Sequence, residues 1–342
     1  MKMNPAVEKP HDSDVATRRD KGFVITQELI VAVAAAVLFV LFSVALDNFL
    51  TPGNLVALVR NVAVLGLLSI GMAVVVIGRG VDLSLVAVMA VSLTVSIVLA
   101  NKGYGFGEAL VIGLGFVLVV ALVLGFLVAY VEIPSIFATL AVASIVYGLG
   151  RGVIADLDVN NIPSDLDWFL FIGRGSVLGI PVSIWLFAFT ALVLYLFLRR
   201  TGIGRFIYAL GDNLETARIT GIPVRPVIVL QYIISGLMAF LAGAVTAASV
   251  ASMNMRIVNS TVIYDVLLVV VLGGIGLTGG RGGVRNVVVG TALIGLLLNA
   301  MTIMDISYTV QNLIKSAVLL LALIVDALLN PRDEQTAQQG DI

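Results

Sequence analysis

The sequence of 342 residues contains no cysteine and a single histidine, and only 12% of its residues are charged. The absence of cysteine excludes disulfide frameworks, thiolate metal sites and thiol nucleophiles. The one histidine, His11, lies in a polar N-terminal segment where side chains are normally solvated, so neither histidine-based catalysis nor a zinc site is expected. The net charge of -1 provides no basic field that would indicate a nucleic-acid partner.

The sequence also lacks a Gly-x4-Gly-Lys-Ser/Thr loop, so we do not expect the chain to bind ATP through a P-loop. A Gly-x-Gly-x-x-Gly pattern occurs at residues 274–279, but it follows an apolar segment and not a strand of a βαβ unit. We therefore reject a dinucleotide site there. No catalytic residue, metal site or cofactor of its own is expected for this chain.

Apolar residues make up 60% of the chain, against about 45–50% in soluble domains, which indicates a membrane protein. About 20 apolar residues are needed to cross the hydrocarbon core as a helix. The apolar segments predict an all-α integral membrane protein with about ten transmembrane helices, although one or two short segments leave a re-entrant conformation open. The predicted spans are 23–46, 55–78, 82–101, 108–131, 135–155, 181–198, 227–251, 262–278, 284–303 and 310–329.

The lysine and arginine residues predict the orientation. With the N-terminus in the cytoplasm and ten alternating spans, 14 of the 20 basic residues lie on the inner side. This arrangement predicts a cytoplasmic N-terminal tail (1–22), a transmembrane domain (23–329) and a cytoplasmic C-terminal tail (330–342). Within the domain, 199–226 forms a cytoplasmic loop and 156–180 an outer, periplasmic one.

The loop 199–226 is the longest polar segment between spans, and it predicts a short helix of about two turns. Asp212 is expected to cap its start, with Glu215 three residues later completing a capping box. Gly221 suits the left-handed position after a helix end, and Pro223 prevents continuation. So short a helix is not stable alone in water. It therefore packs either on a partner protein or on the membrane interface, and the residues leave both alternatives open.

Three motifs in this sequence resemble those of a known family. Glu215-Thr216-Ala217, followed three residues later by Gly221, is similar to the Glu-Ala-Ala-x3-Gly coupling motif of bacterial ATP-binding-cassette importers, with threonine in place of the usual alanine. Residues 80–84 (Gly-Val-Asp-Leu-Ser) resemble the Gly-Ile-Asp-Leu-Ser signature of ribose/xylose/galactoside permeases. Residues 272–282 resemble the family's glycine-rich segment. Arg79, where the family usually has glycine, is a departure.

The resemblance implies a permease subunit in the bacterial inner membrane that works as a dimer with an identical or paralogous chain. It implies a periplasmic sugar-binding protein and a cytoplasmic ATPase, which uses ATP and Mg, as partners. It assigns docking on that ATPase to residues of the short helix, namely Asp212, Asn213, Glu215, Thr216, Ala217 and Gly221.

Several polar residues close to predicted spans are candidates for a translocation path or gate. Asp82, with Ser84, lies at the break before the third span, where we favour a helix-capping role over contact with a solute. A polar cluster is predicted around the start of the eighth span from Asn254, Arg256, Asn259, Tyr264 and Asp265. Lys315 lies inside the tenth span. Snorkelling or hydrogen bonding between helices is the alternative for each of these residues.

Two further patterns concern packing. The break near residues 76–84 resembles that at 271–278, which indicates either an internal repeat or a chance recurrence of glycine-rich breaks. Ala239, Gly243 and Ala247 place small residues four apart, a spacing that allows two helices to approach closely.

Together with these observations, the family resemblance implies an importer subunit that translocates a monosaccharide or related polyol across the bilayer by alternating access, without covalent chemistry. An ion-coupled secondary transporter is the main rival, but it would need carboxylates at mid-membrane, and most acidic residues lie at span ends. A membrane enzyme is disfavoured because no catalytic constellation is present. The sequence does not specify which sugar is carried.

Overall fold

The computed structural model describes residues 27–329, and each predicted span contains a helix. Predicted and observed ends mostly agree within a few residues. The exception is the span predicted at 262–278, whose helix ends at Leu272 because the glycines that follow start a turn. The main helices are α1 (Gln27–Ala45), α2 (Pro52–Ile77), α3 (Leu85–Asn101), α4 (Phe106–Ala129), α5 (Ser135–Leu149), α7 (Val182–Arg200), α10 (Val224–Val250), α11 (Val262–Leu272), α12 (Val284–Ile303) and α13 (Tyr308–Leu329).

Seven of the described helices are long and apolar enough to cross a bilayer, namely α1, α2, α4, α5 with its π-helical extension η1 (Gly150–Ile154), α7, α10 and α12. Three shorter apolar helices occupy the other predicted spans: α3, α11 and the described part of α13. The chain is a mostly helical, multi-pass membrane protein.

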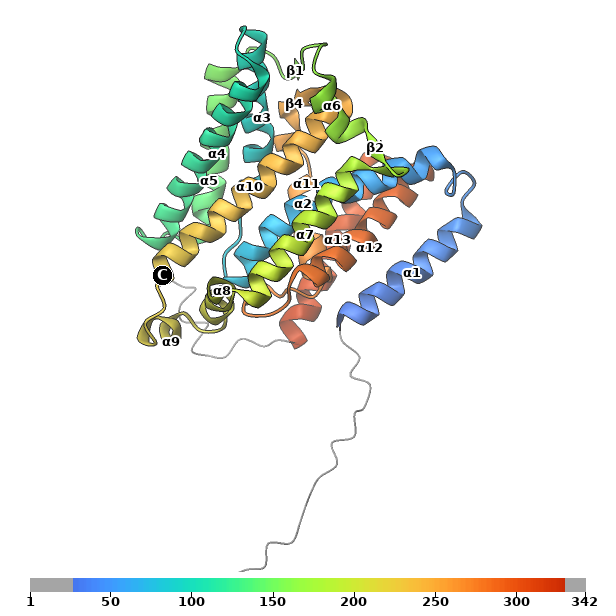
Figure 1. Cartoon of the computed structure of the whole chain (residues 1–342). Helices are drawn as coiled ribbons and strands as arrows, with labels where there is room; N and C mark the ends of the chain where they lie inside the picture. The colour runs from blue at the N-terminus through green and yellow to red at the C-terminus, as the bar shows by residue number, and fades with distance from the viewer. Residues whose placement is uncertain (1–26, 330–342) are drawn as a thin grey trace, which may run out of the picture.

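Successive main helices run in opposite directions along the bundle (Figure 1). The start of α1 and the end of α13 lie at the same end of the bundle as two short helices, α8 (Gly202–Asp212) and α9 (Leu214–Ile219). We call this the α9 end. The opposite end, called the β1 end, carries α6 (Asp167–Arg174), the 3-10 helix η2 (Met255–Asn259) and four strands of two or three residues.

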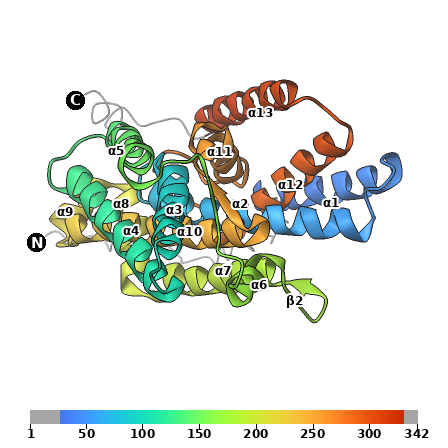
Figure 2. The same ribbon diagram turned by 90° about the horizontal axis from the view of Figure 1, so that it is seen from above.

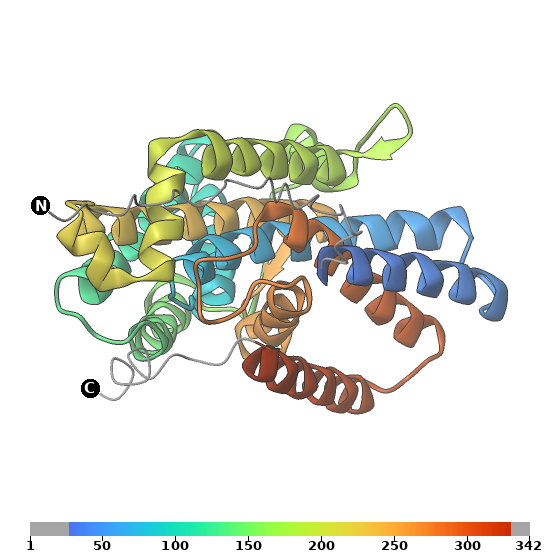
Figure 3. The ribbon, with the colours of Figure 1, turned by 90° about the horizontal axis from the view of Figure 1, so that it is seen from below.

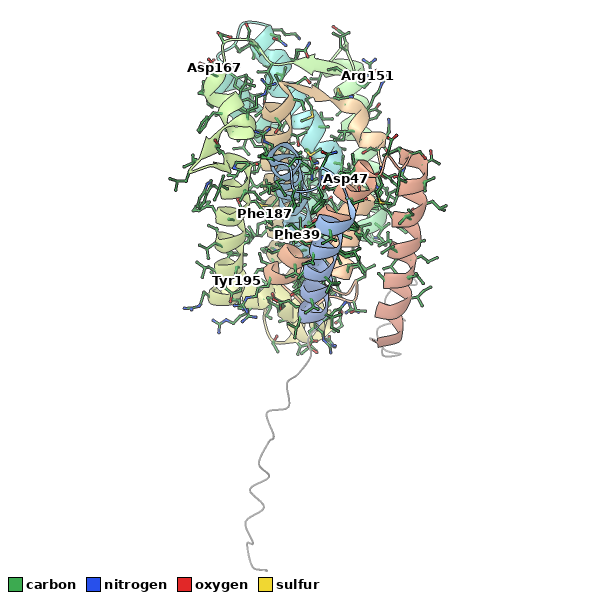
Figure 4. The ribbon with its side chains drawn as sticks, turned by 90° about the vertical axis from the view of Figure 1, so that its right-hand side faces the viewer. Phe39, Asp47, Arg151, Asp167, Phe187 and Tyr195 are labelled. Atoms are coloured by element: carbon green, nitrogen blue, oxygen red, sulfur yellow. The ribbon has the colours of Figure 1, made fainter. Side chains whose placement is uncertain are left out.

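The four strands are an addition to the all-helical expectation. β1 (Val159–Asn161) pairs antiparallel with β4 (Ser252–Asn254), and β2 (Ser176–Val177) pairs with β3 (Ile180–Pro181). The β1–β4 pair ties the 156–180 loop to the segment after α10. Figure 4 labels Arg151 and Asp167 at this end of the molecule and Tyr195 toward the opposite one.

The long helix α10 occupies the middle of the bundle and packs against α2, α3 and α4 (Figure 2). Its small residues permit this: a Cβ added at Gly243 would lie 2.7 Å from the Leu93 side chain and 2.8 Å from the Met89 carbonyl oxygen of α3. Ala239 and Ala247 are fully buried. The predicted role of this spacing in helix packing is confirmed. The helices at the periphery instead expose many large apolar side chains, as lipid contact requires.

Two glycines of α4 test how tightly the bundle is packed. A Cβ at Gly125 would lie 2.8 Å from the Val229 Cα of α10, whereas a Cβ at Gly115 would meet nothing within 4 Å. Gly125→Ala therefore forces the two backbones apart and should destabilise the protein by about 1–3 kcal/mol. Gly115→Ala should be neutral or slightly stabilising. Thermal unfolding of the purified protein in detergent compares them, and equal melting temperatures would contradict this packing.

Candidate functional site

The 199–226 loop forms two short helices where the sequence predicted one. The unpredicted helix is α8, whose start is capped by the Thr201 hydroxyl, which accepts a hydrogen bond from the Gly204 N–H at 3.0 Å. Asp212 is the last residue of α8. The predicted cap on α9 by Asp212 is therefore wrong by one residue.

The true cap of α9 is Asn213, whose side-chain oxygen accepts from the Thr216 N–H at 2.8 Å. Glu215 does not complete a capping box; it forms a salt bridge with Arg218 one turn later, at 3.1 Å. A residue that ends one helix cannot also take the extended conformation of the next helix's cap, so the role passes to Asn213.

The end of α9 is as predicted. Gly221 has a φ of +81°, the left-handed conformation that glycine adopts without strain. Its N–H donates to the Arg218 carbonyl at 3.1 Å, and the Ile222 N–H donates to the Ala217 carbonyl at 3.1 Å. These two bonds complete a Schellman motif, which satisfies carbonyls that the helix itself leaves free.

One side of α9 is attached to the bundle and the other faces outward. Ala217 is buried, and Arg218 also reaches Glu132 of the α4–α5 connection at 3.5 Å. Glu215 and Arg218 are exposed, and Ile219 is 84% exposed. The short helix thus presents an apolar side chain and charged groups outward. Figure 3 shows its ribbon, in yellow, at the left edge of the molecule seen from below.

The end of α8 contacts two distant parts of the chain at one point. The N–H of Gly280, in the segment after α11, donates to the Ile77 carbonyl at the end of α2, at 2.8 Å. Gly211 of α8 packs directly on this bond, and a Cβ there would collide with the Ile77 oxygen and lie 2.5 Å from the Gly280 nitrogen. We call Ile77, Gly211 and Gly280 the glycine junction.

The two breaks that meet at the glycine junction have the same local geometry. Arg79 after α2 and Gly274 after α11 both have positive φ, 73° and 94°. In each case the next residue's N–H bonds the carbonyl five residues earlier, at 2.9 Å after α2 and 3.0 Å after α11. The segments 76–84 and 271–278, whose sequences resemble each other, thus both end their helices in a Schellman turn.

Asp82 is buried at the first break, inside the bundle. One carboxylate oxygen accepts from the Ser84 N–H at 3.0 Å and from the Ser84 hydroxyl at 2.5 Å, while the other accepts from the Ser235 hydroxyl of α10 at 2.6 Å. Ser84 immediately precedes α3, so the carboxylate holds the turn before the helix and attaches it to α10. The cap residue of α3 is Ser84, and no side chain caps the helix, so the predicted capping role of Asp82 is wrong. Its carboxylate instead has the structural role of joining the turn to α10.

The break also rests on Gln231 of α10, which the sequence reasoning missed. Its side chain lies against Gly78, where a Cβ would collide with it. Its Nε2 is buried and has no hydrogen-bond partner among residues 27–329. The sequence signal that could have identified Gln231 is a side-chain amide within a mainly apolar span, because burying an amide in a membrane costs free energy.

The polar cluster predicted near the eighth span separates into distinct contacts. The Asn254 side-chain oxygen accepts a hydrogen bond from the Arg256 N–H and caps the start of η2. Arg256 and Arg151 both form salt bridges with Asp158, at 2.7 and 2.8 Å, beside the β1–β4 pair. Asn259 donates to the Tyr147 hydroxyl at 3.2 Å. Tyr264 is exposed, and Asp265 turns to the other side of α11. The expectation of one cluster is wrong, because these residues lie on different faces of η2 and α11.

Asp265 instead forms a buried ion pair with Lys315 of α13. The Lys315 ammonium lies 2.8 and 3.0 Å from the two carboxylate oxygens and 3.1 Å from the Thr261 hydroxyl. Asp265 is 7% exposed and Lys315 is 8% exposed. Since α13 packs mainly on α11 at the edge of the bundle, as Figure 2 shows, this pair is a principal attachment of α13.

No group of three or more His, Asp or Glu side chains that could hold a metal occurs within residues 27–329. The sequence profile of a family described as the permease component of branched-chain amino acid transport systems matches residues 54–324. The chain belongs to this permease family. No solved structure matches it.

Curated relatives of the permease are components of sugar import systems. It is 29% identical to the ribose import permease protein RbsC of Escherichia coli K12, over 90% of this chain and 95% of the relative. It is 31% identical to RbsC of Bacillus subtilis, over 85% and 89%. It is 30% identical to the L-arabinose transport system permease protein AraH of Escherichia coli K12, over 86% and 88%.

The glycine junction predicts a sharp difference between two glycines of α8 in the permease. Gly211→Ala places a methyl group in the Ile77–Gly280 bond, whereas a Cβ at Gly202 meets nothing within 4 Å. We expect Gly211→Ala to reduce solute uptake at least tenfold and Gly202→Ala to keep the parental rate. Uptake is normalised to the amount of protein in the membrane. Equal rates for the two variants would show that the junction tolerates displacement.

The buried ion pair predicts a non-additive pair of substitutions. Lys315→Met leaves the Asp265 carboxylate without its cation, and removing one partner of a buried pair costs about 3–5 kcal/mol. The double variant Lys315→Met/Asp265→Leu removes both charges and should be more stable than either single variant. Thermal unfolding of the four proteins measures the cycle. Additive losses would contradict direct coupling between the two side chains.

Proposed function

We propose that the chain is the membrane-spanning subunit of an ATP-driven importer, and that it carries a monosaccharide or related polyol across the bacterial inner membrane. Relatives named for ribose, galactofuranose and L-arabinose support the solute class. The alternating helix directions support ten crossings, with the start of α1 and the end of α13 at the α9 end and this end in the cytoplasm. The loop rich in arginine at that end agrees with the positive-inside rule.

The observation that carries this proposal is the position of α9. It is closed by caps at both ends, exposes Ile219 at its tip, and follows α8, which touches both helix breaks at the glycine junction. A partner bound to α9 thus acts on α2–α3 and on α11–α12 through one backbone contact. A cytoplasmic ATPase that hydrolyses ATP with Mg is the partner this arrangement suits.

The remaining partners follow from the two-ended organisation. A periplasmic sugar-binding protein meets the β1 end, where Asp158 with its two arginines holds the β1–β4 pair in place. A second permease chain, identical or paralogous, completes the pathway. Alternating access then requires that ATP-driven closure of the ATPase changes the relative free energies of inward-facing and outward-facing bundles.

The α9 tip gives the most direct test. Ile219→Asp places a charge on a side chain that is 84% exposed, so the fold has little reason to change, but an apolar docking contact is lost. Leu178→Asp is the matched control, because Leu178 is 89% exposed at the β1 end. We expect Ile219→Asp to abolish copurification of the ATPase and ATP-dependent uptake, and Leu178→Asp, at the opposite end, to preserve copurification of the ATPase.

Two substitutions within α9 extend this test. Gly221→Pro is incompatible with the φ of +81°, and Glu215→Lys reverses a charge on the exposed side. Both should block uptake while the protein still inserts. If the ATPase associates equally with every variant, α9 is not its docking site. If no ATPase associates and uptake collapses with the proton or sodium gradient, the chain is a secondary transporter.

A further inference from the structure

A small hollow opens at the α9 end, separate from the glycine junction and from α9 itself. It lies where the last turn of α7, the first turn of α12, α8 and the glycines 282–283 meet. Its interior of about 30 Å³ exceeds the roughly 10–15 Å³ that one water molecule needs, so the oxygens of a small ligand group fit inside.

Two arginines converge on one aromatic ring at this hollow. The Arg199 guanidinium lies 5.5 Å from the centre of the Tyr195 ring, and that of Arg285 lies 5.0 Å from it. Arg285 also donates to the Tyr195 hydroxyl at 2.9 Å. Neither guanidinium forms a salt bridge within residues 27–329, and the one carboxylate lining the hollow, that of Glu28, is outside salt-bridge distance of both. The hollow therefore has a net positive charge.

The backbone adds further donors for an anion. α12 begins at Val284, and its cap residue Gly283 has no side chain that could accept from the first N–H groups. These groups form the positive end of a helix of 20 residues. The Tyr208 hydroxyl donates to the Gly282 carbonyl at 2.9 Å and fixes this wall. Burial raises the pKa of Tyr208, so its phenol stays protonated and keeps this hydrogen bond to Gly282.

The surroundings indicate what carries the anion. Figure 4 places Tyr195 toward the α9 end, and α7 ends shortly after it, at Arg200. Above the hollow, toward the middle of the bundle, α7 and α12 expose Leu192, Leu196 and Val288. An inorganic phosphate ion would use the arginines alone, whereas a phospholipid would also cover these apolar side chains with its acyl chains.

We infer that this hollow binds the phosphate group of an anionic phospholipid from the leaflet at the α9 end, with Arg199 and Arg285 as its charged ligands. The phosphate oxygens enter the hollow that both arginines line, and the acyl chains lie along α7 and α12. Guanidinium groups suit this role because they bind phosphate through two parallel hydrogen bonds.

The test uses the full-length permease purified in mild detergent and supplied with phosphatidylglycerol, phosphatidylcholine or inorganic phosphate. Native mass spectrometry counts bound lipids, and the melting temperature reports stabilisation by binding. We expect phosphatidylglycerol to bind and to raise the melting temperature more than phosphatidylcholine. Arg199→Ala/Arg285→Ala should weaken phosphatidylglycerol binding at least tenfold.

Two control variants make the outcome decisive. Arg200→Ala removes an exposed arginine from the same turn of α7 that does not line the hollow, and it should bind like the parent. Arg199→Lys/Arg285→Lys keeps the charge and should recover part of the affinity, which shows that the loss is not a folding defect. Equal binding by the double alanine variant and Arg200→Ala would overturn the site. Stabilisation by inorganic phosphate without retained lipid would overturn the lipid assignment.

Discussion

The hydrogen bond from the Gly280 N–H to the Ile77 carbonyl is the contact on which much of the α9 end depends. A helix that ends inside a membrane protein leaves carbonyls that water cannot reach, so the protein itself must supply donors. Here the donor comes from a segment about 200 residues later in the chain. Gly211 allows α8 to pack directly over that bond, and the bond in turn fixes where the glycine-rich segment after α11 can run.

This arrangement connects the breaks of two helices through one backbone contact. α2 and α11 end in the same type of turn, and each is followed by a helix that runs back through the bundle, α3 and α12. A displacement of α8 therefore reaches both helix pairs at once. Because glycines make these contacts through the backbone, no flexible side chain absorbs the motion. The glycine junction is thus suited to pass a movement of α9 into the membrane.

Charges inside the bundle are used for attachment, whereas two arginines at its α9 end are available for binding. Asp82 accepts three hydrogen bonds from two serines, and Asp265 is neutralised by Lys315, so each buried carboxylate fixes one helix to another. At the α9 end, Arg199 and Arg285 stack on Tyr195, and neither forms a salt bridge with a carboxylate among residues 27–329. The difference follows from solvation. A buried charge loses its hydration and must be paired, whereas a charge at the interface stays hydrated and can bind a ligand later.

The sequence by itself determined the membrane class, the position of every main helix and the left-handed end of α9, because these depend on local hydrophobicity and on single glycines. It also placed Asp82 at the break before α3. Only the tertiary structure decided which distant groups meet: Gly280 with Ile77, Ser235 with Asp82, and Lys315 with Asp265. It also moved the α9 cap to Asn213 and divided the outer polar cluster. Such contacts depend on how helices rotate and cross when they pack, which no local pattern of one sequence encodes.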